Sequence, residues 1–210
     1  ATTTDTVGTA IGTYTLNYSA TDSAGNSSSL QRTVNVIANP SSISAIDSSK
    51  WFHQTLLPNG SSWYNGELQH YTDRTENSYV SNGTLKIVAK KESYRDQNVT
   101  KNYTSARLNS KYAFQYGTVE VRAKLPSGVG TWPAIWMLAS QTDYGTQFWP
   151  DNGEIDILEH VGYNPGVIHA SVHTKAFNHG INTQKTATTT LDKWDSEFHL
   201  FRVDWTPDYI

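Results

Sequence analysis

Apolar and polar residues alternate one by one through most of the chain after Trp51, and this pattern limits the possible folds more than any other feature. In residues 118–125, for example, valine, alanine and leucine alternate with glutamate, arginine and lysine. Successive side chains of a strand point to opposite faces, so this period predicts strands with one face turned inward. Glycine-bearing turns separate the runs, and no long helical periodicity appears. We therefore predict an all-β chain that folds as a β-sandwich of jelly-roll type, with one concave face that carries a cleft.

Residues 153–161, Gly-Glu-Ile-Asp-Ile-Leu-Glu-His-Val, place three carboxylates within six positions of an otherwise aliphatic segment. An acidic side chain is costly on a strand unless it faces water, a partner or a substrate. Regular alternation puts Glu154 and Asp156 on one face but sends Glu159 to the opposite, apolar face. Because a lone buried glutamate is unfavourable, we predict a one-residue β-bulge near Ile157–Leu158 that returns Glu159 to the acidic face.

With this bulge, Glu154 and Glu159 lie about four strand steps apart, roughly 13 Å between Cα atoms. Side-chain reach and a concave sheet shorten the gap, so that a carboxyl separation of about 5–5.5 Å is reachable. This separation is the geometry of glycosidases that retain the configuration of the anomeric carbon. The alternative interpretation is a solvated strand with scattered acids.

Two tryptophans precede the acidic segment. Trp132 and Trp136 lie four residues apart, which predicts that both project from one face of a strand, with Ala134 between them. Flat indole rings stack on the apolar faces of sugar rings, so the pair is a candidate carbohydrate platform. The alternative is that both tryptophans belong to the core of the sandwich.

In residues 168–173 the aliphatic side chains share one face, and His169, Ser171 and His173 share the other. We expect this strand to pair with the acidic strand, which would bring a polar face beside the carboxylates. The two histidines could indicate a metal site, but no third ligand follows at metal spacing; a structural role is the alternative for His169. Arg107 is a candidate donor to sugar hydroxyls or a partner that keeps the acids ionised, and a plain surface ion pair is its alternative.

These segments resemble glycoside hydrolase family 16, in particular its laminarinase branch of endo-β-1,3-glucanases. The pattern Glu-x-Asp-x-x-Glu, which follows Trp149-Pro150 and Gly153, is similar to the active-site strand of that branch. Branches that act on mixed-linkage glucan or xyloglucan typically have the shorter Glu-x-Asp-x-Glu. Ala106 stands where the Thr-Ser-Gly-Arg turn of the family has glycine. The likeness covers roughly residues 51–210, and its other matching stretches are residues 63–72, 103–107, 116–126 and 130–138.

The resemblance implies a concanavalin A-like β-sandwich and retaining endo-hydrolysis of β-1,3-glucan by double displacement. At the matching positions Glu154 is the nucleophile, Glu159 is the acid and then the base, and Asp156 is a carboxyl that can hydrogen-bond to the nucleophile. Three clustered acids cannot all stay ionised cheaply, so we expect their titrations to be coupled and one pKa to be raised. The glucan-binding residues that we expect are Asn65, Arg107, Trp132, Trp136 and His173.

Two other interpretations stay open. A non-catalytic glucan-binding module could share the fold, although such relatives usually lack one or both of the glutamates that this chain has. An enzyme of the same fold could act instead on mixed-linkage β-1,3-1,4-glucan or on a red-algal galactan such as agarose or carrageenan. Sulfated galactans call for cations along the cleft, and residues 127–180 contain only Lys175, which favours a neutral glucan.

Composition limits the other classes of function. The 210 residues carry a net charge of −3 without a basic run, and only 17% are charged, so we expect no nucleic-acid partner. No apolar stretch approaches the about 18 residues that a membrane span requires, so we expect no membrane insertion. Cysteine is absent, which excludes disulfides. We expect a monomer that requires no cofactor, and we assign no metal ligands. The resemblance to family members implies that a structural calcium ion is possible in the full-length protein.

The first part of the chain predicts a β-hairpin. Residues 11–20 alternate with Tyr14, Leu16 and Tyr18 on one face, and a turn and a second strand follow, which resembles the last two strands of a bacterial immunoglobulin-like repeat. We expect both ends of the chain to be cut, with a signal peptide upstream and further catalytic-domain strands downstream, and a secreted or cell-surface location. The predicted parts are residues 1–37, a partial immunoglobulin-like domain; residues 38–50, a linker; and residues 51–210, a partial catalytic domain.

Overall fold

The computed structural model describes residues 5–7, 12–36 and 43–210, and contacts divide the chain into two units, residues 1–109 and 110–210. The regular structure of the described residues is β-strand, with two single-turn 3₁₀ helices and no α-helix. None of the described helices is long and apolar enough to cross a membrane. The all-β prediction is therefore confirmed. Residues 38–42 of the predicted linker lie outside the described residues.

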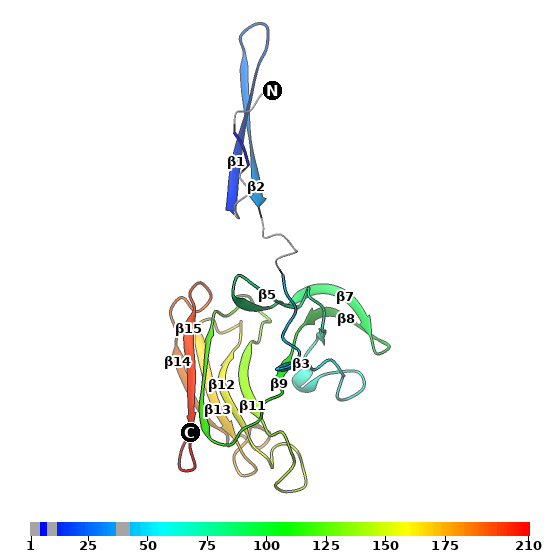
Figure 1. Cartoon of the computed structure of the whole chain (residues 1–210), viewed down its shortest axis with the longest axis vertical. Coiled ribbons are helices and arrows are strands. Elements are labelled where there is room, and N and C mark those ends of the chain that lie inside the picture. Colours follow the sequence, from blue (N-terminus) through cyan, green and yellow to red (C-terminus); the bar gives the residue numbers. More distant parts are fainter. Residues whose placement is uncertain (1–4, 8–11, 37–42) are drawn as a thin grey trace. The chain divides into compact units, whose positions relative to one another are not determined.

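The predicted hairpin is present in the first unit (Figure 1). Strands β1 (Gly12–Thr21) and β2 (Ser27–Val36) pair antiparallel, with Tyr14 opposite Val34 and Tyr18 opposite Leu30. The turn between them is closed by Asp22, whose Oδ1 accepts the backbone N–H groups of residues 24 and 26. Asp22 is a residue type that favours such turns because its short side chain bonds to the backbone two residues on.

The remaining strands of the first unit form three small sheets. β3 pairs with β9, β4–β8–β7 form a three-stranded sheet, and β5 pairs with β6. A single 3₁₀ turn, η2 (Tyr64–Gly66), precedes β4. The strand bounds are β3 (Trp51–His53), β4 (His70–Tyr71), β5 (Ser78–Ser81), β6 (Thr84–Ile87), β7 (Lys90–Asp96), β8 (Val99–Ser105) and β9 (Leu108–Ser110).

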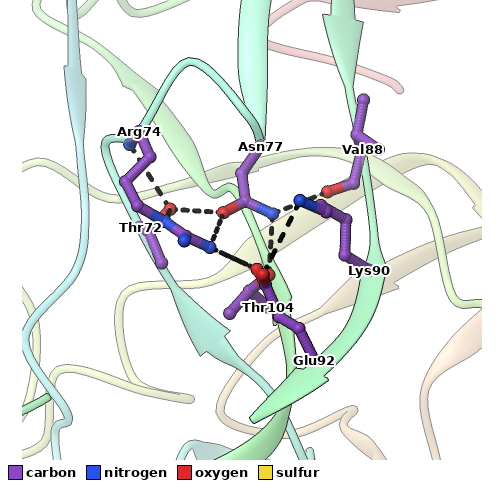
Figure 2. A network of polar contacts seen from close by, with 7 residues as sticks. All are labelled: Thr72, Arg74, Asn77, Val88, Lys90, Glu92 and Thr104. Atoms are coloured by element: carbon purple, nitrogen blue, oxygen red, sulfur yellow. Dashed lines mark hydrogen bonds and ion pairs between the residues drawn. The ribbon is translucent and has the colours of Figure 1, made fainter. Parts of the chain in front are cut away.

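A polar network joins two of these sheets, β4–β8–β7 and β5–β6 (Figure 2). At its centre is Asn77, which is fully buried and whose amide donates to the carbonyl of Val88 at 3.0 Å and to Thr104 Oγ1 at 2.9 Å. Its Oδ1 accepts the hydroxyl of Thr72 and an N–H of Arg74. Arg74 and Thr104 also bond to the carboxylate of Glu92. The network satisfies polar groups that would otherwise be buried without partners.

The second unit contains two sheets and η3 (His179–Ile181). β11, β12, β13 and β14 form an antiparallel sheet in chain order, and β10 pairs with β15. Both sheets contribute to one core around Leu125, Leu158 and Ile168, so they pack face to face (Figure 1). The alternation predicted for residues 118–125 is confirmed. The strand bounds are β10 (Gly117–Ala123), β11 (Ala134–Leu138), β12 (Glu154–His160), β13 (Val167–His173), β14 (Lys185–Thr190) and β15 (His199–Trp205).

The C-terminal end of β12 is anchored by His160. This residue is fully buried, its Nε2 accepts the backbone N–H of Gly166, and its ring stacks on Trp194 with centroids 4.3 Å apart. Burial lowers the pKa of His160, and nearby His169 lowers it further, so the ring stays neutral. Strand β12 is thus attached to the core at the end opposite Glu154.

Candidate active site

The predicted bulge is present in β12. On one side Asp156 pairs with Trp136 and Leu158 with Ile135, which leaves Ile157 as the extra residue. On the other side Asp156 pairs with Ser171 and Glu159 with His169, so that two residues of β12 oppose one residue of β13. Leu158 points into the core, where it is fully buried. The bulge therefore returns Glu159 to the face of Glu154 and Asp156.

The pairing defines one polar face across three strands, which we call the acidic face. Glu154 lies opposite Leu138 of β11 and His173 of β13, and Asp156 lies opposite Trp136 and Ser171. The predictions that β13 pairs with the acidic strand and turns its polar side chains to the acids are confirmed. The members of the acidic face are Ala134, Trp136, Leu138, Glu154, Asp156, Glu159, His169, Ser171 and His173.

Each glutamate of this face accepts a hydrogen bond from an indole N–H. Trp132 Nε1 donates to Glu159 Oε1 at 3.0 Å, and Trp149 Nε1 donates to Glu154 Oε2 at 2.6 Å. Trp132 itself is 47% exposed, so it is not a core residue. The prediction that Trp132 lies on the same strand as Trp136 is wrong, because β11 begins only at Ala134. Pro133 lacks an N–H and cannot extend the ladder as a donor.

The protonation of the acidic face follows from burial and crowding. Burial raises the pKa of Asp156 to about 9, and the neighbouring charges of Glu154 and Glu159 contribute. Asp156 is 4% exposed and hydrogen-bonds to Glu154, so at neutral pH it is a protonated donor to that carboxylate. Burial raises the pKa of Glu154 as well, while the bonds from Asp156 and Trp149 oppose this rise. The expectation that one clustered acid has a raised pKa is confirmed.

His173 completes this arrangement from β13. Its Nε2 lies 3.1 Å from Asp156 Oδ2, and both side chains are buried. Burial lowers the pKa of His173, and His179 lowers it further, so the imidazole is neutral. A neutral ring whose Nε2 carries the proton donates to Asp156, and Asp156 in turn donates to Glu154. The chain of donors therefore ends on Glu154.

Two residues of this site were missed by the sequence analysis as functional candidates, Trp149 and His179. Trp149 lies in the segment between β11 and β12, and His179 begins η3 after β13. Their ring centroids are 4.6 Å apart, and His179 also lies 5.3 Å from His173. The sequence indicated Trp149 only as part of the motif that precedes the acidic strand, without a role of its own. No local sequence pattern distinguishes His179 from other histidines.

The first unit holds the other two predicted binding residues, Asn65 and Arg107. Asn65 is exposed in η2 with φ 57°, a left-handed conformation that asparagine tolerates better than most residues. The guanidinium of Arg107 lies over the ring of buried Trp63, 5.2 Å from its centroid. The two units are described separately, so the expectation that Asn65 and Arg107 line the same cleft as the acidic face stays a prediction. No group of three or more potential metal-binding side chains occurs in the part of the chain that the structure describes.

A β-sandwich with two glutamates on one face is typical of retaining glycoside hydrolases. Residues 65–210 match the family profile "Glycosyl hydrolases family 16", and the chain belongs to this family. Residues 2–36 match "Bacterial surface protein, Ig-like domain", which indicates a cell-surface context.

Individual relatives agree with this assignment. A β-glucanase of Rhodothermus marinus is 48% identical over 167 residues, which are 78% of this chain and 56% of the relative. The X-ray structure of a Rhodothermus marinus laminarinase superposes with a TM-score of 0.73 at 47% identity, over 79% of this chain and 64% of that one. LamA of Zobellia galactanivorans, solved with laminaritriose and laminaritetraose, gives a TM-score of 0.69 at 46% identity, over 78% and 70% of the two chains. The predicted sandwich fold is thereby confirmed, and the chain spans little more than half the length of the curated β-glucanase.

Proposed function

We propose that the protein is a retaining endo-hydrolase of β-1,3-glucan, a laminarinase. The observation that carries this proposal is the bulge in β12, because it brings Glu159 to the face of Glu154. The two carboxyl groups differ in surroundings: Glu154 accepts bonds from Asp156 and Trp149, whereas Glu159 accepts a bond from exposed Trp132. Paired acids with unlike environments can take unlike roles.

In the first step of the proposed mechanism, a carboxylate oxygen of Glu154 attacks the anomeric carbon while protonated Glu159 gives its proton to the glycosidic oxygen. The glycosidic bond breaks, and a covalent glycosyl-enzyme forms. Glu159, now a carboxylate, then takes a proton from water as the water oxygen attacks the anomeric carbon and releases Glu154. Asp156 keeps its proton and stabilises the Glu154 carboxylate through the hydrogen bond. The reaction uses side chains and water only, so no cofactor is proposed.

The proposed substrate follows from the lining of the site and from the relatives. Indole rings at Trp132 and Trp136 suit the apolar faces of glucose units, and His173 adds a polar contact at the centre. Lys175 is the only lysine or arginine in residues 127–180, which supports a neutral polymer rather than a sulfated one. The β-glucanase and laminarinase names of the relatives support the same choice. We extend the binding site to Asn65 and Arg107 as part of this proposal.

The test is hydrolysis of laminarin by the chain and by Glu154→Ser. We expect the wild type to release oligosaccharides, with the β-anomer first in NMR spectra of early products. Glu154→Ser should lose more than about a thousandfold in kcat because the covalent step is removed. Glu120→Ser is a matched control, since Glu120 is exposed on β10 and pairs with Arg202, and it should retain the wild-type rate.

Four outcomes would contradict the proposal. Activity of Glu154→Ser at the wild-type rate would remove the nucleophile assignment, and early release of the α-anomer would exclude a retaining mechanism. Binding of laminarin without hydrolysis would identify a non-catalytic glucan-binding module. Faster hydrolysis of lichenan or agarose than of laminarin would assign the other substrates of this fold.

We also propose that the protein is extracellular and attached to the cell surface rather than freely secreted, because residues 2–36 match a bacterial surface immunoglobulin-like domain.

A further inference from the structure

The segment between β11 and β12 holds Trp149 in a framework of hydrogen bonds. The Asn152 side chain accepts the N–H groups of residues 143 and 144 and donates to three carbonyls of the same loop. Asp151, whose side chain is 5% exposed, accepts the N–H groups of residues 146 and 147 and pairs with Lys175. This closed set of side-chain to backbone bonds fixes the loop before any substrate binds.

Trp149 projects from this loop toward Glu154. Its N–H donates to Glu154 Oε2, and its ring contacts His173 at 6.0 Å and His179 at 4.6 Å between centroids. His173 is buried, whereas His179 is exposed, and the two imidazoles also contact each other, with centroids 5.3 Å apart. The indole and the two imidazoles therefore contact one another as a triangle of rings, and the indole turns its single donor to one oxygen of Glu154.

We propose that Trp149 and His179 are positioning residues that hold Glu154 in one rotamer and in its ionised form. The inference rests on the proposed function, in which Glu154 is the nucleophile, and neither residue needs to contact the substrate. With Oε2 held by the indole and the carboxyl also bonded to Asp156, the rotation of the Glu154 carboxylate is restricted. A nucleophile held in this way loses little rotational freedom when it attacks.

The titratable groups around Glu154 in the second unit lie on three neighbouring elements. Asp156 and Glu159 lie on β12 itself, His173 faces it from β13, His179 from η3, and β11 offers uncharged Leu138. The positive charge that His179 gains on protonation and the N–H of Trp149 both lower the pKa of Glu154, against burial and the charge of Glu159. The pair therefore extends the pH range of the ionised nucleophile toward acid.

Trp149→Phe and His179→Phe test the proposal, because each keeps an aromatic ring and removes one polar group. We expect Trp149→Phe to lower kcat roughly 10- to 100-fold with little change in KM, since a hydrogen bond to a charged group is lost. The acid limb of the pH–rate profile should move to higher pH in both variants. Trp132→Phe is the matched control: it removes the indole bonded to Glu159 and should leave the acid limb at the wild-type pH. His179 is exposed, so His179→Phe is not expected to disturb folding.

A second measurement is independent of turnover. NMR titration of the ¹³C-labelled Glu154 carboxyl, assigned by comparison with Glu154→Gln, should show a higher pKa in Trp149→Phe and in His179→Phe than in the wild type. Unchanged titration and an unchanged acid limb would overturn the inference, and a loss confined to KM would make Trp149 a sugar contact instead. An inactive wild type, or an active Glu154→Ser, would instead refute the proposed function, and the titration would still test the pair.

Discussion

Replacement of Asp156 by Asn is expected to stabilise the folded protein, increasingly so as the pH rises. The pKa of this carboxyl is about 9 in the folded protein and 3.8 ordinarily. A group whose pKa is raised on folding contributes stability that is complete below its unfolded pKa and is lost as the pH rises toward its folded pKa. At neutral pH the wild type must therefore take up a proton at Asp156 when it folds. Asn is isosteric with the protonated acid and can donate the same hydrogen bond to Glu154 without this cost.

The magnitude follows from the width of the pH window. One pH unit corresponds to about 1.4 kcal/mol for one bound proton. Between pH 5 and pH 8 the difference in unfolding free energy between Asp156→Asn and the wild type should thus grow by about 4 kcal/mol. Urea unfolding monitored by tryptophan fluorescence at four pH values across this range measures the difference directly.

A second aspartate provides a control of opposite sign. Hydrogen bonds from the backbone N–H groups of residues 146 and 147 lower the pKa of Asp151. Asp151→Asn should therefore destabilise the protein at neutral pH, and the loss should shrink only as the pH falls below 3.8. A difference for Asp156→Asn that stays flat from pH 5 to pH 8 would refute the reasoning, because it would show that Asp156 is already ionised in the folded protein.

Two further changes test the fold. Asn77→Ala should lower the unfolding free energy by about 3 kcal/mol, because it leaves the buried partners of Asn77 without hydrogen bonds. Asn102 lies on the exposed side of β8, so the control variant Asn102→Ala should change the unfolding free energy by less than about 0.5 kcal/mol in the same urea titration. Deletion of Ile157 removes the bulge but leaves Glu-x-Asp-x-Glu, so the variant should fold and keep its acids on one face. Deletion of Ile157 with Leu158 makes the second glutamate adjacent to Asp156, which sends it to the core. If the two deletion variants unfold at the same urea concentration, the alternation of side chains along β12 does not determine which residues lie on the acidic face.

The bulge was predictable because strict alternation conflicted with the cost of burying Glu159, and only an extra residue resolves that conflict. The pairing of β12 with β13 was predictable for a similar reason, since polar residues repeat at every second position of 168–173. Both inferences require only that successive side chains of a strand point to opposite faces. The start of β11 was misjudged because spacing alone does not show that the regular strand begins only after Pro133.

Trp149 and His179 could not be predicted as partners, because their contact joins two loops that are 30 positions apart in the sequence. Their placement depends on the bonds of Asn152 and Asp151 to backbone groups, and such bonds leave no periodic pattern. Resemblance to the family could indicate Asn65 and Arg107, yet their relation to the acidic face depends on how the two units are arranged. Local alternation therefore predicts which side chains share a strand face, while the contacts from loops have to be seen in the structure.

The position of the acids on β12 has a physical reason. This strand is central in its sheet, and its core side holds fully buried Leu158 and His160. A strand that is fixed on one face can hold costly groups on the other, because the apolar burial of the core offsets the unfavourable crowding of Glu154 and Asp156. An exposed edge strand such as β14 could carry the same acids with less cost, but their pKa values would then stay near the ordinary range and their side chains would be free to rotate. The proposed chemistry thus requires its acids on the central strand, where their burial and crowding cost the most free energy. The bulge lets this strand turn Leu158 to the core and Glu159 to the acidic face.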